Sequence, residues 1–307
     1  MKNGHRYLFL FTVFLVASLK GGMPGQDSLG TFLKTHKTKY PFISGNTFRS
    51  FAKFVIDVNH DSIDTALIED GDVIFVWNKL IGYFFEKIHP RIQHKYILIT
   101  HNGCLSVPGK YASYLNSDKL IVWFGKNATL SHPKLIPIPV GLEGGADIEV
   151  LKKVINGTFT KDIFAYLNVS VKKDRGKERS QAAEILSCKN FCYKSNPKPF
   201  YDYLCDLARS KFVFSPRGSG LDCYRTWEAM LLDAIPIVKH SAIDSLYEGL
   251  PVLLIDDWNA ITEEFLQKEY DRIQLQVSRQ KFKMEKLYAD YWFDLINSFS
   301  EQVHNSG

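Results

Sequence analysis

Short apolar runs that alternate with helical patterns constrain the fold of this chain more than any other feature of its sequence. Each run in the first half of the chain spans five or six residues, most of them apolar. These runs occupy residues 72–77, 96–100, 120–124 and 135–140. Uninterrupted apolar runs of this length are typical of strands buried on both faces of a parallel sheet. Pro137 and Pro139 mark the last run as an edge strand or the exit from the domain, because proline cannot donate to a strand ladder.

A second series of the same kind follows. Its predicted strands occupy residues 163–167, 191–193, 211–214, 235–238 and 251–255. Its predicted helices occupy residues 176–186, 201–208 and 224–232. Residues 261–304 read as helical, with apolar contacts expected from Leu266, Tyr270, Ile273, Leu287, Trp292 and Leu295. Two successive series of strands and helices predict an α/β fold with two Rossmann-like domains that face a cleft, separated near residues 143–160.

The N-terminus is typical of a secretory protein. Lys2, His5 and Arg6 precede an apolar run at 7–19, which is the pattern of a signal peptide. The run is short for a bilayer span, so a cleaved signal and a short uncleaved anchor both stay open. The predicted segments are 1–25 (signal peptide or signal-anchor), 26–150 (acceptor-side domain, entered through an irregular or helical region at 26–62), 151–260 (donor-binding domain) and 261–307 (C-terminal helices).

Glycosylation sequons agree with export. They begin at Asn127, Asn156 and Asn168, and a position of Asn168 inside a strand would obstruct its glycosylation. We therefore expect a Golgi or ER-lumenal type II membrane protein, or a secreted one if the signal is cleaved. Five cysteines leave at least one thiol unpaired, and no two pairs show zinc-ligand spacing, so no metal site is expected. The net charge of +5, without long Lys/Arg runs, suits a small anionic ligand and disfavours nucleic acid as a partner.

The loop at 215–222 lies between a predicted strand and a predicted helix, where ligands of α/β sheets gather. Its glycines allow close approach of the backbone, and the helix N-terminus offers free amides to an anion. Arginines add forked donors that match phosphate oxygens. The residues expected to contact the anion are Arg217, Gly218, Ser219, Gly220 and Arg225.

Three more residues are candidates for the same site. Glu228, in the helix after the loop, can accept hydrogen bonds from both hydroxyl groups of a ribose. Arg179, together with Lys177, can reach a donor phosphate or an acceptor, although a solvated helix face is the simpler role. The structural alternative for the whole segment is that Asp222 caps the helix and that Arg225 and Glu228 form a surface pair.

The run SPRGSGLDCYRTWEAMLLDAIPIV, followed by SLYEGLPVLLIDDW, resembles the donor-binding half of exostosin-like glycosyltransferases. The runs ITHNG, WFGKN and HPKLIPIPVGLE are more loosely similar to the acceptor side, so the resemblance covers roughly residues 70–260. It implies an inverting enzyme of the GT-B architecture, in which Arg217 and Arg225 hold the diphosphate and Glu228 holds the ribose. Asp233 and Ala234 stand where relatives commonly carry a small pair. The long acceptor-binding extensions of the heparan-sulfate polymerases are absent, so their substrate is not implied.

The predicted function is transfer of a sugar from a nucleotide-diphosphate donor, most simply a UDP-sugar, to a hydroxyl of a glycan or glycoprotein. The arginines and helix amides can stabilise the departing diphosphate without a metal or other cofactor. His101 and Glu143, which follow predicted strands of the first domain, are the candidates for the general base. The alternatives are that His101 and Asn102 form a turn held by local hydrogen bonds and that Glu143 is a solvated loop carboxylate. Asp256 and Asp257 read as a strand-end cap rather than as metal ligands. The alternatives are a catalytically inactive sugar- or nucleotide-binding scaffold of the same fold and a two-lobed receptor, which would need no ribose or diphosphate contacts.

Overall fold

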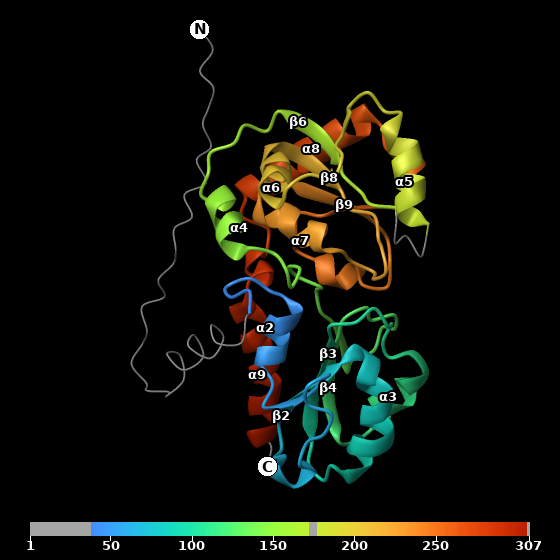
Figure 1. Ribbon diagram of the computed structural model, residues 1–307, viewed down its shortest axis with the longest axis vertical. Coiled ribbons are helices and arrows are strands. Elements are labelled where there is room, and N and C mark those ends of the chain that lie inside the picture. Colours follow the sequence, from blue (N-terminus) through green and yellow to red (C-terminus); the bar gives the residue numbers. More distant parts are fainter. Residues whose placement is uncertain (1–37, 172–176, 306–307) are drawn as a thin grey trace.

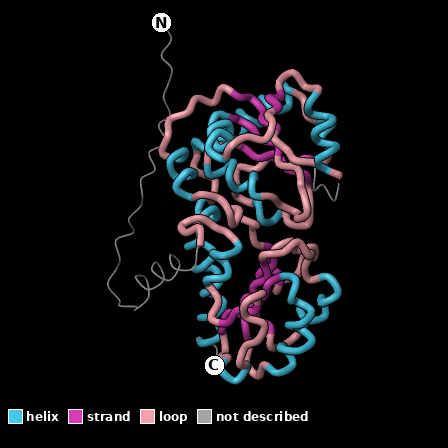
Figure 2. Tube along the Cα trace, in the orientation of Figure 1, coloured by secondary structure: helices cyan, strands magenta, loops and turns pink. Residues whose placement is uncertain are grey.

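The computed structural model describes residues 38–171 and 177–305 and has two lobes stacked along its long axis (Figure 1). The predicted signal segment at 1–25 lies outside the described residues. Each lobe holds one five-stranded sheet in which every neighbouring pair of strands is parallel. Figure 2 shows the strands at the centre of each lobe with helices outside them. The α/β prediction with two parallel sheets is therefore confirmed.

The sheet of the N-terminal lobe has the order β1-β2-β3-β4-β5. Its strands are β1 (Phe54–Ile56), β2 (Asp72–Trp77), β3 (Tyr96–His101), β4 (Leu120–Gly125) and β5 (Leu135–Pro137). Strand β5 lies at the edge of this sheet, as its prolines predict. The prediction of an irregular or helical entry region was incomplete, because β1 pairs with β2 there. A three-residue strand is too short to show a period in the sequence.

Helices cover both faces of this sheet (Figure 1). Helix α2 (Gly45–Ser50) lies on one face, and α3 (Ile81–Tyr83) lies on the other. Helix α3 lies in the segment that follows β2 in the chain. Among the described residues, the π-helix η3 spans Phe84–Ile88. The 3-10 helices there are η1 (Thr65–Leu67), η2 (Asn78–Leu80), η4 (His89–Arg91), η5 (Gly109–Asn116), η6 (Asp244–Tyr247), η7 (Trp258–Ala260) and η8 (Met284–Leu287).

The sheet of the C-terminal lobe has the order β10-β9-β8-β6-β7. Its strands are β6 (Ile163–Leu167), β7 (Cys192–Lys194), β8 (Ser210–Phe214), β9 (Ile235–Lys239) and β10 (Leu253–Ile255). Its helices are α4 (Ile148–Ile155), α5 (Glu178–Ser187), α6 (Phe200–Arg209) and α7 (Tyr224–Leu231). The five strands and three helices predicted in this region are all present. The stretch at 143–160 lies between the last strand of the first sheet and the first strand of the second.

The two C-terminal helices serve different lobes. Helix α8 (Glu263–Ser278) packs on the C-terminal lobe through Leu266 and Ile273. Helix α9 (Ala289–His304) returns to the N-terminal lobe, where the ring of Trp292 contacts Phe48 at a centroid distance of 5.8 Å. The chain therefore crosses between the lobes twice. No helix in the described ranges is long and apolar enough to cross a membrane.

Candidate functional site

The loops that follow the strands of the two sheets meet between the lobes. The backbone N–H of Leu221, in the loop after β8, donates to Asn127 Oδ1 after β4 at 2.9 Å. The backbone N–H of Val140 donates to Asp222 Oδ2 at 2.7 Å. Because these strands are parallel within each sheet, the carboxyl-terminal edges of both sheets face the same cleft.

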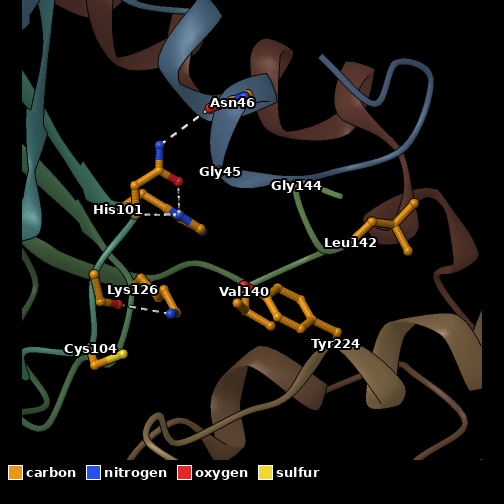
Figure 3. A pocket seen from close by; sticks show the side chains of 11 residues that line it. Gly45, Asn46, His101, Cys104, Lys126, Val140, Leu142, Gly144 and Tyr224 are labelled. Atoms are coloured by element: carbon orange, nitrogen blue, oxygen red, sulfur yellow. Dashed lines mark hydrogen bonds between the residues drawn. The ribbon is translucent and has the colours of Figure 1, made fainter. Parts of the chain in front are cut away.

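A cavity of about 330 Å³ opens into this cleft (Figure 3). Most of its wall belongs to the N-terminal lobe, and Tyr224 of α7 is the contribution of the C-terminal lobe. The lining residues are Gly45, Asn46, His101, Asn102, Gly103, Cys104, Lys126, Val140, Leu142, Gly144 and Tyr224. The polar atoms among them are amide, imidazole, ammonium and phenol groups, which suit hydroxyl-bearing ligands.

His101 lies at the end of β3 with both ring nitrogens bonded to the backbone. Its Nε2 lies 3.0 Å from the carbonyl oxygen of Pro139, and its Nδ1 accepts from the Asn102 N–H at 2.7 Å. This geometry fits the neutral tautomer with its proton on Nε2. Burial, followed by the charge of Lys126, lowers the pKa of His101 to about 4. The imidazole therefore has no free lone pair for a substrate, which disfavours the prediction of His101 as the base.

Glu143 lies between Leu142 and Gly144, which both line the cavity. Its side chain is exposed, and it makes no hydrogen bond or ion pair with the described residues. Burial raises the pKa of both Tyr224 and Glu228, and the nearby Glu143 charge raises it further. The structure thus brings one predicted base close to the predicted ribose-binding carboxylate. The catalytic role of Glu143 stays a prediction.

Arg217 is held by a carboxylate that the sequence did not point to. Glu178, at the start of α5, accepts from the Arg217 backbone N–H at 3.0 Å and from Arg217 Nε at 2.7 Å. Glu178 is buried, so the pair fixes the direction of the guanidinium. The two residues lie 39 positions apart in the sequence, and no local pattern links them.

Arg179 and Arg225 carry the unused donors of the site. A Cβ built on Gly218 would lie 2.5 Å from Arg179 Nη2, so only glycine lets this guanidinium approach the loop so closely. Arg179 Nε is buried and has no hydrogen-bond partner among the described residues. Arg225 Nε and Nη1, in the first turn of α7, are in the same state. Predicted donor-site residues from α5, the loop and α7 are therefore neighbours here.

Glu228 is buried under the same helix. Its Oε2 accepts a hydrogen bond from Tyr203 Oη at 2.7 Å, and burial raises its pKa. The surface-pair alternative is therefore wrong, because this carboxylate is 5 % exposed. The helix-cap alternative for Asp222 is also wrong. The N-cap of α7 is Cys223, and the Asp222 carboxylate accepts from Val140 N–H and from Trp227 Nε1 at 2.9 Å.

The remaining loop residues differ in accessibility. Ser219 is exposed at the tip of the loop, and Gly220 lies against the side chain of Asn127. Asp257 caps the short helix η7 by accepting from the Asn259 N–H, as predicted for this strand end. Within residues 38–171 and 177–305, no group of three or more His, Cys, Asp or Glu side chains could hold a metal ion.

The structure separates the three sequons. Asn127 is 2 % exposed and its Oδ1 is bonded to Leu221, so glycosylation of Asn127 is incompatible with this packing, and that prediction was wrong. Asn156, at the C-cap of α4, is exposed. Asn168 directly follows β6, and its Nδ2 donates to Tyr166 Oη at 3.0 Å. The five cysteines are all free thiols.

Comparison with known proteins adds little. No protein-family model and no curated protein matches this sequence. Among solved structures, the chain is similar to one described as "Crystal structure of GtfA/B complex", with 11% sequence identity and a TM-score of 0.41. The match covers 77% of this chain and 59% of that chain, so the matched part is less than two thirds of the other protein. A likeness of this size identifies neither a family nor an activity.

Proposed function

We propose that this protein is a glycosyltransferase of the GT-B type that binds a nucleotide-diphosphate sugar at the loop 215–222 and transfers the sugar to a hydroxyl group in the cleft. The observation that carries the proposal is the pair of buried, unpartnered donors on Arg225. A buried N–H without a partner is costly, and a positively charged one calls for an anion. The resemblance of residues 215–238 to exostosin-like enzymes supports the same assignment.

The chemistry of the neighbours supports a diphosphate joined to a ribose. Arg179 and Arg225 approach the glycine loop from α5 and α7, whereas the charge of Arg217, within the loop, is balanced by Glu178. Two guanidinium groups without an ion pair among the described residues suit a diphosphate better than a single phosphate monoanion. The Glu228 carboxylate would repel a phosphate but can accept hydrogen bonds from hydroxyl groups, and the hydrogen bond from Tyr203 already orients it. A ribose hydroxyl beside Glu228 and phosphates beside the arginines use both kinds of group.

In the proposed reaction, an acceptor hydroxyl in the cavity attacks the anomeric carbon of the donor sugar. The new bond joins the acceptor oxygen to that carbon, and the bond from the carbon to the terminal phosphate oxygen breaks. Its electron pair leaves with the nucleoside diphosphate, and the acceptor proton passes to Glu143. A single displacement inverts the anomeric configuration. Arg217 and Arg225 stabilise the charge on the leaving group, so we expect transfer to persist without added metal.

Binding of UDP and GDP to the wild-type protein and to Arg225→Ala tests this proposal. Calorimetry and the shift in melting temperature report the affinity. Loss of two charge-assisted hydrogen bonds, together about 3 kcal/mol, should weaken nucleotide binding about a hundredfold. A screen for sugar transfer and hydrolysis with UDP- and GDP-sugars then separates an enzyme from an inactive scaffold.

Arg209→Ala is the matched control. Arg209 lies in the same lobe, but its Nε is bonded to Asp162 Oδ1 at 2.9 Å on the surface. This variant should bind nucleotide as the wild type does. The proposal fails if neither diphosphate raises the melting temperature of the wild-type protein, or if both arginine variants bind equally well.

A further inference from the structure

Asn127 brings a buried amide of the N-terminal lobe onto the glycine loop of the C-terminal lobe. It lies two residues beyond the end of β4 and is 2 % exposed. Its Oδ1 accepts from the Leu221 N–H. Its Nδ2 is buried as well, and no described residue accepts a hydrogen bond from it. One end of the amide therefore holds the loop, and the donor end is unused.

The loop is shaped to admit this amide. A Cβ built on Gly220 would lie 2.8 Å from Asn127 Oδ1 and 3.5 Å from Nδ2, so a larger residue at 220 would push the amide away. Asn127 has a φ of 58°, in the left-handed region that asparagine tolerates better than most residues. The backbone and the glycine together place the Nδ2 group against the loop.

Unused donors are concentrated around this loop. In the described part of the chain, the residues with buried, unpartnered side-chain polar atoms are Asn127, Arg179, Arg225, Tyr247 and Trp258. Arg179 lies against Gly218, and Arg225 opens the helix that follows the loop. Tyr247 is close enough to Arg217 and Asp222 for their charges to act on its pKa, which burial raises. Trp258 packs in the core against Phe214, the last residue of β8. A ligand that accepts hydrogen bonds from Asn127, Arg179 and Arg225 must be rich in acceptor oxygens.

We propose that Asn127 Nδ2 donates a hydrogen bond to the terminal phosphate of the bound nucleotide diphosphate, so that the N-terminal lobe completes the donor site. This inference rests on the proposed function. Transfer across the cleft requires the bond between the sugar and the terminal phosphate to face the acceptor side. A group that reaches the loop from that side therefore meets the terminal phosphate rather than the one next to the ribose.

Two variants test the donor role of Asn127 in complementary ways, one without loss of the loop contact and one without added charge. Asn127→Asp keeps an oxygen for the Leu221 N–H but has no N–H of its own. Asn127→Gly removes the side chain without adding charge and accepts the positive φ. Calorimetry with UDP and UMP, and with GDP and GMP if the guanine nucleotides bind better, should show about tenfold weaker binding of the diphosphate in both variants. Binding of the monophosphate should change less than twofold.

Asn156→Asp makes the same chemical change at the exposed end of α4 and should leave both affinities unaltered. If the wild-type protein binds the diphosphate and the Asp variant binds it as tightly, Asn127 serves only the loop and the inference is overturned while the proposed function stands. Equal weakening of diphosphate and monophosphate would also overturn it. If the wild-type protein binds no nucleotide, the proposed function fails and the inference fails with it.

Discussion

On the N-terminal side of the cleft, His101 and Lys126 spend their hydrogen bonds on the protein and Asn127 keeps one buried donor unused. On the C-terminal side, two arginines keep several buried donors unused. His101 is bonded to the backbone at both nitrogens, and Lys126 Nζ donates to the Gly103 carbonyl at 2.9 Å. Arg179 and Arg225 instead keep buried N–H groups without a partner among the described residues. Both sides follow the ends of parallel strands, so the difference lies in side chains and not in topology.

This difference predicts unequal ligand binding on the two sides. A ligand on the C-terminal side gains hydrogen bonds that cost the protein nothing to make available, because no internal bond must break. Apart from the Asn127 Nδ2 group, the N-terminal side offers a ligand only groups with internal bonds that must be displaced, or the exposed groups at the rim. We therefore expect the nucleotide to bind tightly on its own and the acceptor to bind weakly. Glu143 is the exposed carboxylate that this side offers to chemistry.

The largest expected effect comes from Glu143→Gln. Removal of a general base should slow sugar transfer about a thousandfold while nucleotide affinity stays within about twofold of the wild-type value. Single-turnover transfer assays and calorimetry measure the two quantities separately. Glu149→Gln, which alters an exposed glutamate paired with Lys152 on α4, is the control. Sugar transfer by Glu143→Gln at the wild-type rate would contradict the role of Glu143 as the general base.

The second effect concerns the stability of the N-terminal side. The pKa of His101 falls from 6.5 to about 4 through burial, so between these pH values the unfolded chain binds the extra proton and the folded chain does not. The contribution of His101 to the free energy of unfolding is complete above pH 6.5. It falls by about 3 kcal/mol as the pH falls toward 4. Denaturant unfolding between pH 7.5 and 4 should therefore be less pH-dependent in His101→Gln.

His89→Gln serves as the companion variant, because burial also lowers the pKa of His89 to about 4. Each substitution should remove its own part of the pH dependence, and the two parts should add, since the residues share no hydrogen bond. If His101→Gln leaves the pH dependence unchanged, His101 titrates normally, and its nitrogens are not committed to the backbone as the structure has them.

Local patterns in the sequence predicted the strands well and placed the 215–222 loop between a strand and a helix, whereas its role in donor binding stays a prediction. The strands at 72–77 and 163–167 have the predicted bounds because their apolar runs are uninterrupted. Arg217 and Arg225 could be named as candidates for anion binding because a strand, a loop and a helix that are consecutive in the chain place them. The same pattern does not report burial, so it could not decide between a ligand site and a surface ion pair.

Local sequence patterns could not predict hydrogen bonds between residues that are far apart in the chain. Glu178 lies 39 residues from Arg217, and Asn127 lies 94 residues from Leu221. The sequon at Asn127 was misleading for the same reason, because three residues specify the motif but only the packing of the two lobes buries it. The return of α9 to the N-terminal lobe also depends on contacts such as that between Phe48 and Trp292, which no local period encodes.

The smallest expected effect tests whether Glu228 recognises a ribose. Glu228→Gln keeps the size of the side chain and can still accept from Tyr203 Oη, but it loses one acceptor oxygen. A hydrogen bond to a charged group contributes about 1.5 kcal/mol, so UDP binding should weaken about tenfold. The wild-type protein should bind 2′-deoxy-UDP, which lacks the 2′-hydroxyl, more weakly than UDP. The substitution should leave the affinity for 2′-deoxy-UDP unchanged. Equal losses for both nucleotides would mean that Glu228 acts by orienting Arg225, and the C-terminal side would then recognise only the phosphates.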